Sequence, residues 1–196
     1  MWQRAAVALA LAGAVVIARP GVSGAQSGGW LEGQLTNWNT PGMALPTAPP
    51  ATTTSPMCVG LGRPPQSPAD QQLAQRGWTL FGAFQGGWGI EVVRAGSEMD
   101  GMCRPMQYNV FVFRDGQFVG TVSPVLMDSR TTGQEAGTTL LGPQGAQNPV
   151  RLTSRFLRYA PEDPLCCPSL PAVVVTYEVQ PTDGGYVLGP ISKEPG

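Results

Sequence analysis

The clearest group of side chains that could do chemistry in this 196-residue chain is Met127-Asp128-Ser129-Arg130. It places a carboxylate, a hydroxyl and a guanidinium side by side, where they could orient a small ligand or stabilise an oxyanion. A serine nucleophile needs a base, however, and the chain has no histidine and a single lysine, Lys193. Such a group is more typical of a turn held by an Asp–Arg pair and a capping hydroxyl. We therefore keep Asp128 and Arg130 as possible ligand contacts and predict no catalytic residue.

The missing histidine excludes several classes of enzyme. Ser-His-Asp and Cys-His mechanisms and histidine-ligated zinc all need an imidazole, so we expect no metal and no cofactor. Asp100, Asp128 and Asp163 could serve glycoside hydrolysis only if two of them lay close together, which the sequence does not indicate. The net charge is −1 and no window concentrates basic residues, so we expect no nucleic-acid partner.

An aromatic side chain supplies a different candidate contact. Trp88 lies within Gln85-Gly86-Gly87-Trp88-Gly89, where flexible glycines could present its ring to a sugar or to a partner chain. The same pattern also fits a turn after which Trp88 opens a core strand, and we favour that interpretation. Trp88 and Arg104 are kept, with Asp128 and Arg130, as possible ligand contacts.

The four cysteines predict two disulfides, because an even count in an exported chain is typical of a disulfide framework. Three pairings are possible among Cys58, Cys103, Cys166 and Cys167. Adjacent Cα atoms lie about 3.8 Å apart, closer than a disulfide prefers, so we expect Cys166 and Cys167 to bond to Cys58 and Cys103. The order of these two bonds stays open. A redox or thiolate-metal site is the alternative.

The N-terminus carries an export signal. A short positive start is followed by thirteen apolar or glycine residues at 5–17, with Pro20 after them. Small residues lead up to Ala25, so residues 1–25 are predicted to be a signal peptide cleaved near Ala25. Thirteen residues reach about 20 Å, too short to span a bilayer. We expect a secreted or periplasmic protein without a transmembrane segment after cleavage.

The remaining chain divides by composition. Residues 26–66 are rich in proline and threonine and are predicted to form an extended segment, part of which, 30–45, lies against the domain as a strap. Residues 67–191 are predicted to form the domain, and 192–196 a tail. Ser67 as N-cap and Pro68 at the first position predict one short helix, 68–76, which Gly77 ends.

The β-branched and aromatic runs predict an α+β domain with one antiparallel sheet of six or seven strands, stabilised by disulfides. Asp115-Gly116 predicts a hairpin within 108–123, and 131–148 is expected to be a glycine-rich loop. The predicted strands are 78–84, 88–94, 108–114, 117–123, 150–159, 172–179 and 186–191.

Seven short motifs, taken in order, resemble the LppP/LprE lipoprotein family, particularly its cyanobacterial members. The family consists of exported, envelope-associated bacterial proteins, so the resemblance implies a location more than an activity. The chain departs from it in two places: no lipid-acceptor cysteine follows the apolar run before Cys58, and Thr132 stands where the pattern has aspartate. The motifs are Trp38–Gly42, Arg63–Pro65, Gln85–Trp88, Asp100–Pro105, Gly120–Pro124, Met127–Arg130 and Asp163–Ser169.

Together these observations predict an exported bacterial cell-envelope protein that is not an enzyme. We expect it to bind or support an envelope component, which could be a polymer, a small ligand or a protein. The alternative is a hydrolase or redox enzyme that works through carboxylates or through the pair Cys166-Cys167.

Overall fold

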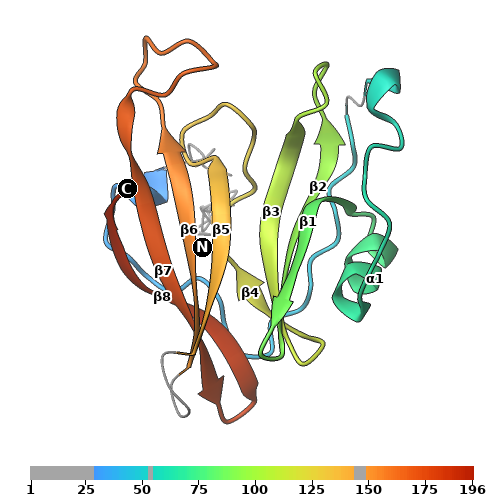
Figure 1. The fold of residues 1–196 in the computed structure, drawn as a ribbon, viewed down its shortest axis with the longest axis vertical. Coiled ribbons are helices and arrows are strands. Elements are labelled where there is room, and N and C mark those ends of the chain that lie inside the picture. Colours follow the sequence, from blue (N-terminus) through green and yellow to red (C-terminus); the bar gives the residue numbers. More distant parts are fainter. Residues whose placement is uncertain (1–28, 53–54, 144–148) are drawn as a thin grey trace, which may run out of the picture.

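The structure, a computed structural model, describes residues 29–52, 55–143 and 149–196, so the predicted signal peptide lies outside the described residues. Strands dominate this part of the chain (Figure 1). Two short 3₁₀ helices, η1 (Gly29–Leu31) and η2 (Pro56–Cys58), precede the α-helix α1 (Pro68–Gln75). The strands are β1 (Thr79–Gly87), β2 (Ile90–Met99), β3 (Pro105–Arg114), β4 (Gln117–Thr121), β5 (Glu135–Pro143), β6 (Val150–Arg158), β7 (Leu170–Thr182) and β8 (Gly185–Pro195).

The strands form two four-stranded antiparallel sheets, in the orders β1-β2-β3-β4 and β5-β6-β7-β8. The prediction of an antiparallel β structure with one short α-helix is confirmed, but the prediction of a single sheet of six or seven strands is wrong. A single sheet of this size exposes two apolar faces, and one helix of eight residues covers only part of one. The second sheet buries the face that the helix leaves open.

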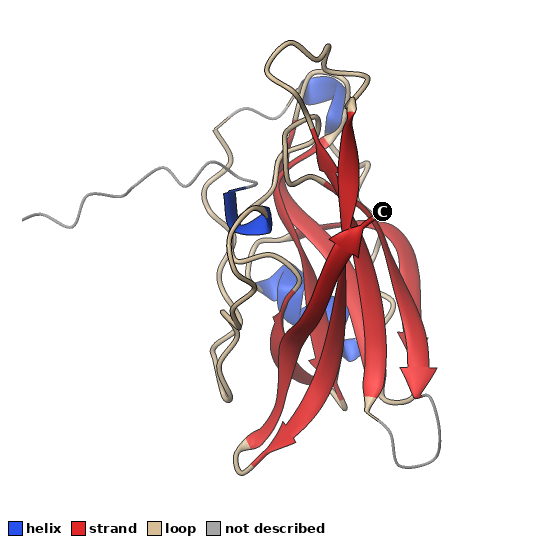
Figure 2. Cartoon of the chain, turned by 90° about the vertical axis from the view of Figure 1, so that its left-hand side faces the viewer, coloured by secondary structure: helices blue, strands red, loops and turns tan. Residues whose placement is uncertain are grey.

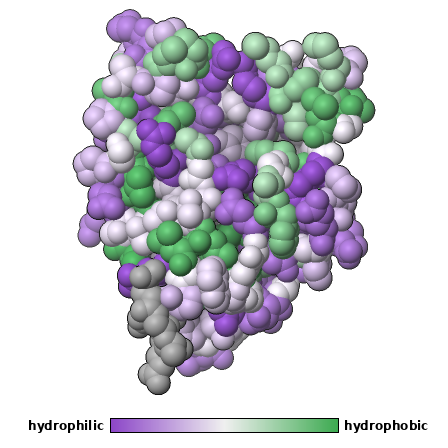
Figure 3. Space-filling view, viewed as in Figure 1, coloured by the Kyte–Doolittle hydropathy of each residue, from purple (hydrophilic) through white to green (hydrophobic). Residues whose placement is uncertain are grey.

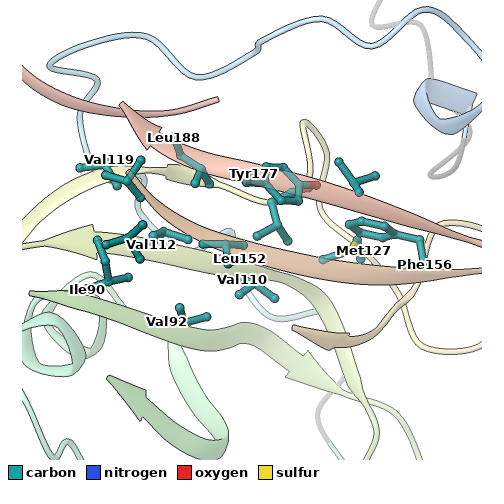
Figure 4. Close-up of a cluster of buried hydrophobic side chains, with 14 of the residues drawn as sticks. Ile90, Val92, Val110, Val112, Val119, Met127, Leu152, Phe156, Tyr177 and Leu188 are labelled. Atoms are coloured by element: carbon teal, nitrogen blue, oxygen red, sulfur yellow. The ribbon is translucent and has the colours of Figure 1, made fainter. Parts of the chain in front are cut away.

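The main core lies between the two sheets (Figure 4). Alternate residues of each strand point into it, including Val92 from β2, Val112 from β3, and Leu152 from β6. On β7 the buried Val175, Tyr177 and Val179 alternate with partly exposed neighbours, because successive side chains of a strand point to opposite faces. The sandwich is therefore held together by burial of apolar side chains from both sheets.

Helix α1 covers the outer face of the first sheet. Ala69 and Leu73 of the helix are fully buried against Val93, Phe111 and their neighbours. Its predicted start is confirmed, since the Ser67 hydroxyl accepts a hydrogen bond from the Asp70 N–H at 3.2 Å. The first sheet is thus buried on both faces, which explains the long run of buried residues in β2.

The strap, residues 30–45, packs against the sandwich (Figure 2). The rings of Trp30 and Trp38 pack edge to face, with their centroids 5.0 Å apart, and the ring of Trp30 packs in the same way against Phe156 of β6 at the same centroid distance. Lys193 of β8 donates a hydrogen bond to the Leu31 carbonyl at 2.7 Å. These contacts attach the strap to the second sheet.

Asn39 of the strap joins the two sheets where β4 and β8 approach each other. Its side-chain amide donates to the Thr121 and Leu188 carbonyls, both at 3.0 Å, and its oxygen accepts the Thr121 N–H at 2.9 Å. Gly120 makes room for it: a Cβ there would lie 2.4 Å from Asn39 Cγ. Two of the sequence motifs, Trp38–Gly42 and Gly120–Pro124, therefore meet in space.

Two segments that were predicted to lie outside the sheet contribute to strands. Strand β5 occupies residues 135–143, half of the segment expected to be a glycine-rich loop, while 144–148 lie outside the described residues. Strand β8 runs to Pro195, so residues 192–195, expected to be a tail, pair with β7. The hairpin at Asp115-Gly116 is confirmed, with φ values of +48° and +79°.

The disulfide pairing also differs from the prediction of two long-range bonds. Cys58 bonds to Cys103, whose Cα lies 5.2 Å away, and the adjacent Cys166 and Cys167 bond to each other. The first bond joins η2 to the β2–β3 turn. The loop carrying Cys166 and Cys167 belongs to the second sheet, and a cleft separates it from that turn. The long-range pairing is therefore wrong because the two loops lie on different sides of this cleft.

Candidate functional site

A cleft of about 470 Å³ opens between the two sheets at the upper end of the molecule in Figure 1. Figure 3 shows the surface hollowed between the two upper lobes. Its walls combine three arginines with apolar and aromatic side chains. They are formed by Phe81, Arg94, Arg104, Pro105, Tyr108, Ser129, Arg130, Gln134, Glu135, Ala136, Leu157, Tyr159, Leu165, Cys166 and Pro168.

An ion pair between the sheets borders the cleft. Arg94 of β2 donates from Nε at 2.9 Å and from Nη2 at 2.7 Å to the two carboxylate oxygens of Glu135, the first residue of β5. The Thr138 hydroxyl adds a third hydrogen bond, at 2.8 Å. The hydrogen bond to Glu135 raises the pKa of Arg94 above its usual value. The carboxylate is thus neutralised within the protein, and its side chain is 2% exposed.

Tyr108 holds the backbone of the same residue. Its hydroxyl accepts the Glu135 N–H at 3.0 Å and donates to the Glu135 carbonyl at 3.1 Å. Burial raises the pKa of Tyr108 well above its usual value, so the hydroxyl stays neutral. Tyr108 therefore fixes the backbone at the start of β5 through two hydrogen bonds.

Arg104 enters the cleft from the β2–β3 turn. Asp100 holds this turn by accepting the backbone N–H groups of Met102 and Arg104, both at 2.9 Å, and by pairing with the Arg104 guanidinium through Nε at 2.7 Å. The Arg104 side chain is 27% exposed. Nε and Nη2 of the guanidinium are used in this pair and Nη1 donates to Met102 Sδ at 3.1 Å, while the side chain lines the cleft.

Arg130 reaches the cleft from the segment that joins the sheets. Asp128 accepts the Gln107 N–H at 2.7 Å, and the Ser129 hydroxyl donates to the Pro105 carbonyl at 2.7 Å, so both side chains fix this segment to the start of β3. Arg130 has a positive φ of +65°. Within the described ranges no carboxylate pairs with its guanidinium. The expected turn is present, but without the Asp–Arg pair.

The opposite wall is the β6–β7 loop, which Asp163 closes into a compact turn. Its Oδ2 accepts the N–H groups of Ser169 and Ala160, both at 2.7 Å. Thr132, where the family pattern has aspartate, bridges to this loop by accepting the Tyr159 N–H at 3.0 Å and donating to its carbonyl at 3.2 Å. These bonds hold Leu165 and Cys166 at the rim of the cleft.

Acid is expected to loosen this loop. The hydrogen bonds from Ser169, and then that from Ala160, lower the pKa of Asp163 in the folded state. The stabilisation is therefore complete above about pH 4, the usual aspartate pKa, and is lost as the pH falls through the lower folded value. NMR should show the Ala160 and Ser169 amide signals titrating with a midpoint below about 3.9. A midpoint at or above that value would contradict the assignment.

The structure brings only part of the predicted contacts together. Arg104 and Arg130 line one cleft, and Asp128 lies behind it in a structural role. Trp88 lies elsewhere, in the β1–β2 turn near the opposite end of the sandwich, and is 57% exposed. The favoured interpretation of Trp88 as a core residue is therefore wrong.

Sequence reasoning missed the three residues that connect the sheets at the cleft. Arg94 lies two residues after the core residue Val92, and Tyr108 lies two residues before the core residue Val110. Because residues two apart in a strand point to the same face, the sequence could have indicated that Arg94 and Tyr108 face the core. No such alternation marks Glu135, because it lies in a segment expected to be a loop. Without the second sheet, nothing indicates that Arg94 and Glu135 face each other.

The cleft offers positive charge but no assembled catalytic group. The three carboxylates considered for hydrolysis, Asp100, Asp128 and Asp163, each accept backbone N–H groups in separate turns. In the ranges that the structure describes, no three metal-ligating side chains lie together and no helix is long and apolar enough to cross a membrane. A two-sheet β-sandwich with an arginine-lined cleft at one end is the class of protein that these observations define.

Residues 90–182 match the family model of the LppP/LprE lipoproteins. The match begins at the start of β2 and ends with β7, so it includes Arg94, Arg104, Arg130 and Glu135. The resemblance seen in the motifs is confirmed over this span, and it indicates an envelope-associated protein. Neither the curated proteins nor the solved structures gave a match.

Proposed function

We propose that this chain is an exported, envelope-associated protein that is not an enzyme, and that its cleft binds a small anionic ligand with an apolar part. The observation that carries the proposal is the charge balance of the cleft. Arg94, Arg104 and Arg130 line it together with one carboxylate, Glu135, whose oxygens are already bonded to Arg94 and Thr138. The Arg104 guanidinium is shared with Asp100 at the edge of the cleft, and Arg130 has no carboxylate partner among the described residues, so Arg130 is left to attract an anion.

The remaining wall residues favour a ligand that is not purely polar. Phe81, Leu157 and Leu165 line the cleft beside the arginines. A volume of about 470 Å³ lies within the range of small-molecule sites, which usually combine apolar walls with a few placed polar groups. A carboxylate or phosphate on a short hydrocarbon chain has this combination of properties.

Binding of hexyl phosphate, measured by isothermal titration calorimetry, tests the proposal. We expect Arg130→Ala to weaken binding about tenfold or more, because a charge-assisted hydrogen bond is worth about 1.5–3 kcal/mol. Arg155→Ala is the matched control, since Arg155 is exposed on the neighbouring strand β6 and does not line the cleft. 1-Hexanol should bind more weakly than hexyl phosphate, and added salt should weaken the binding of hexyl phosphate but not that of 1-hexanol. Equal affinity in the Arg130 and Arg155 variants would contradict the proposal.

A redox role is the second candidate, because Cys166 of the Cys166–Cys167 disulfide lines the same cleft. In that reaction a partner dithiol would give two electrons and two protons to the disulfide, leaving two thiols here and a disulfide in the partner. Oxidation of dithiothreitol, followed with Cys58–Cys103 intact, measures it. A rate equal to that of the Cys166→Ser, Cys167→Ser double variant would remove this candidate.

A further inference from the structure

We propose that the exposed Trp88 is the stacking platform of a second site, one that binds the pyranose rings of a saccharide. The site is a groove of about 570 Å³ near the end of the sandwich opposite the arginine cleft. The ends of several strands form it, and the residues that carry the argument are Trp88, Arg114, Glu178, Gln180 and Tyr186. The proposal does not depend on the function proposed for the cleft.

The backbone conformation at Trp88 suits a small polar residue, so the turn itself does not require a tryptophan at this position. Trp88 and Gly89 form the two-residue loop between β1 and β2, with φ values of +51° and +75°. Two positive φ values are typical of a type I′ turn, which favours Asn-Gly or Asp-Gly. The β3–β4 hairpin of this same chain uses Asp115-Gly116 at the equivalent positions. A large aromatic residue in this conformation is strained, and strain of this kind gathers at functional sites.

Burial does not compensate for the strain, since Trp88 is 57% exposed. The part of its ring that is covered lies over Gly142, where a Cβ would come within 2.8 Å of the indole. The missing side chain at Gly142 thus lets the ring lie close to the β5 backbone. This contact holds the ring at the edge of the groove while leaving more than half of the side chain accessible.

The groove offers one open aromatic surface rather than two. The Arg114 guanidinium lies over the Tyr186 ring, 4.9 Å from its centroid, and occupies that face. A proline-rich peptide is recognised between several aromatic ridges, whereas a sugar ring needs one aromatic face for its C–H groups and polar partners for its hydroxyls. The arrangement therefore favours a saccharide.

Polar partners are available beside the ring. Arg114 uses Nε to bind Asp115 at 2.9 Å, which leaves its terminal amino groups as donors. Among the described residues, the Gln180 side-chain amide makes no hydrogen bond, and Glu178 adds a carboxylate bonded on one side to Arg151. Amide, guanidinium and carboxylate groups can together donate to and accept from sugar hydroxyls.

Calorimetry with chitohexaose and cellohexaose tests the proposal, with a proline decapeptide as the competing probe. We expect at least one of the two saccharides to bind the natural chain, and we expect Trp88→Asn to weaken that binding at least tenfold. Because Asn-Gly suits the turn, the melting temperature of this variant should not fall, and its hexyl phosphate affinity should be unchanged. Phe84→Ala, which removes another exposed aromatic side chain (41% exposed), should bind the saccharide like the natural chain.

Several results would overturn the assignment. Failure of both saccharides to bind the natural chain would do so, as would equal affinity in the Trp88→Asn variant. Binding of the proline decapeptide alone would assign the groove to a peptide instead. A fall in melting temperature that accompanies the loss of binding would show that Trp88 serves the fold. Loss of saccharide binding in Arg130→Ala would place the sugar in the arginine cleft.

Discussion

Asn39→Ala is expected to lower the free energy of unfolding by about 2–4 kcal/mol. The Asn39 side chain is buried and makes three hydrogen bonds to the backbone of β4 and β8, at Thr121 and Leu188. Alanine would leave these backbone groups without that partner in a site closed to water, where each unsatisfied group costs about 1–3 kcal/mol. Urea denaturation monitored by tryptophan fluorescence measures the loss.

Asn39→Asp separates hydrogen bonding from packing, because aspartate has nearly the same shape. Its second oxygen would face the two carbonyls that now accept from the amide, so we expect a loss at least as large as that of alanine. Thr40→Ala is the matched control: Thr40 is the exposed neighbour, and its loss should change stability by less than about 0.5 kcal/mol. If both Asn39 variants lost less than about 1 kcal/mol, the strap would not join the sheets in the way described.

Glu135→Ala is the second variant with a large expected effect. It should lower the free energy of unfolding by about 3 kcal/mol or more. Glu135 binds both Nε and Nη2 of Arg94, whose side chain is only 18% exposed. Removing one partner of such a pair leaves a charge with little access to water, which commonly costs about 3–5 kcal/mol. Chemical denaturation of the single variant provides the measurement.

A double variant distinguishes this cause from simple loss of packing. Arg94→Met combined with Glu135→Met removes both charges, so it should be more stable than Glu135→Ala alone. The pair Arg151–Glu178 provides the control, because the Arg151 side chain is 41% exposed and exposed pairs contribute about 0–1 kcal/mol. A double variant less stable than Glu135→Ala would contradict the interpretation.

Local signals in the sequence predicted much of the local structure. Ser67 and Pro68 gave the start of α1, and Asp115-Gly116 gave the β3–β4 turn, because capping and positive φ depend on a few neighbouring residues. The alternation of buried Val175, Tyr177 and Val179 with partly exposed neighbours likewise follows from the geometry of a single strand. These elements therefore follow from short-range chemistry.

The arrangement of the sheets depended on longer-range contacts. Strand β5 was missed because glycines at 137 and 142 interrupt its pattern, and its pairing with β6 contains two irregularities, one at each glycine. One sheet was predicted because local patterns do not show which strands pair with which. The disulfide pairing failed for the same reason, since it depends on which loops share one side of the cleft.

The candidate site was predicted only where a motif marked it. Arg104 and Arg130 belong to motifs and line the cleft, whereas Arg94 and Glu135 meet only because β2 and β5 lie in facing sheets. Trp88 was also marked by its motif, but its exposure follows from the two-residue turn that its neighbour Gly89 completes. A glycine-rich motif alone does not distinguish a turn residue from the first residue of a strand.

The most direct test of the anion-binding cleft is NMR of the arginine Nε–H signals during titration with hexyl phosphate. The account predicts saturable shifts for Arg104 and Arg130, which face the cleft, and none for Arg151, which lies outside it. Shifts confined to Arg151 or to other arginines outside the cleft would contradict it, as would the absence of any saturable shift.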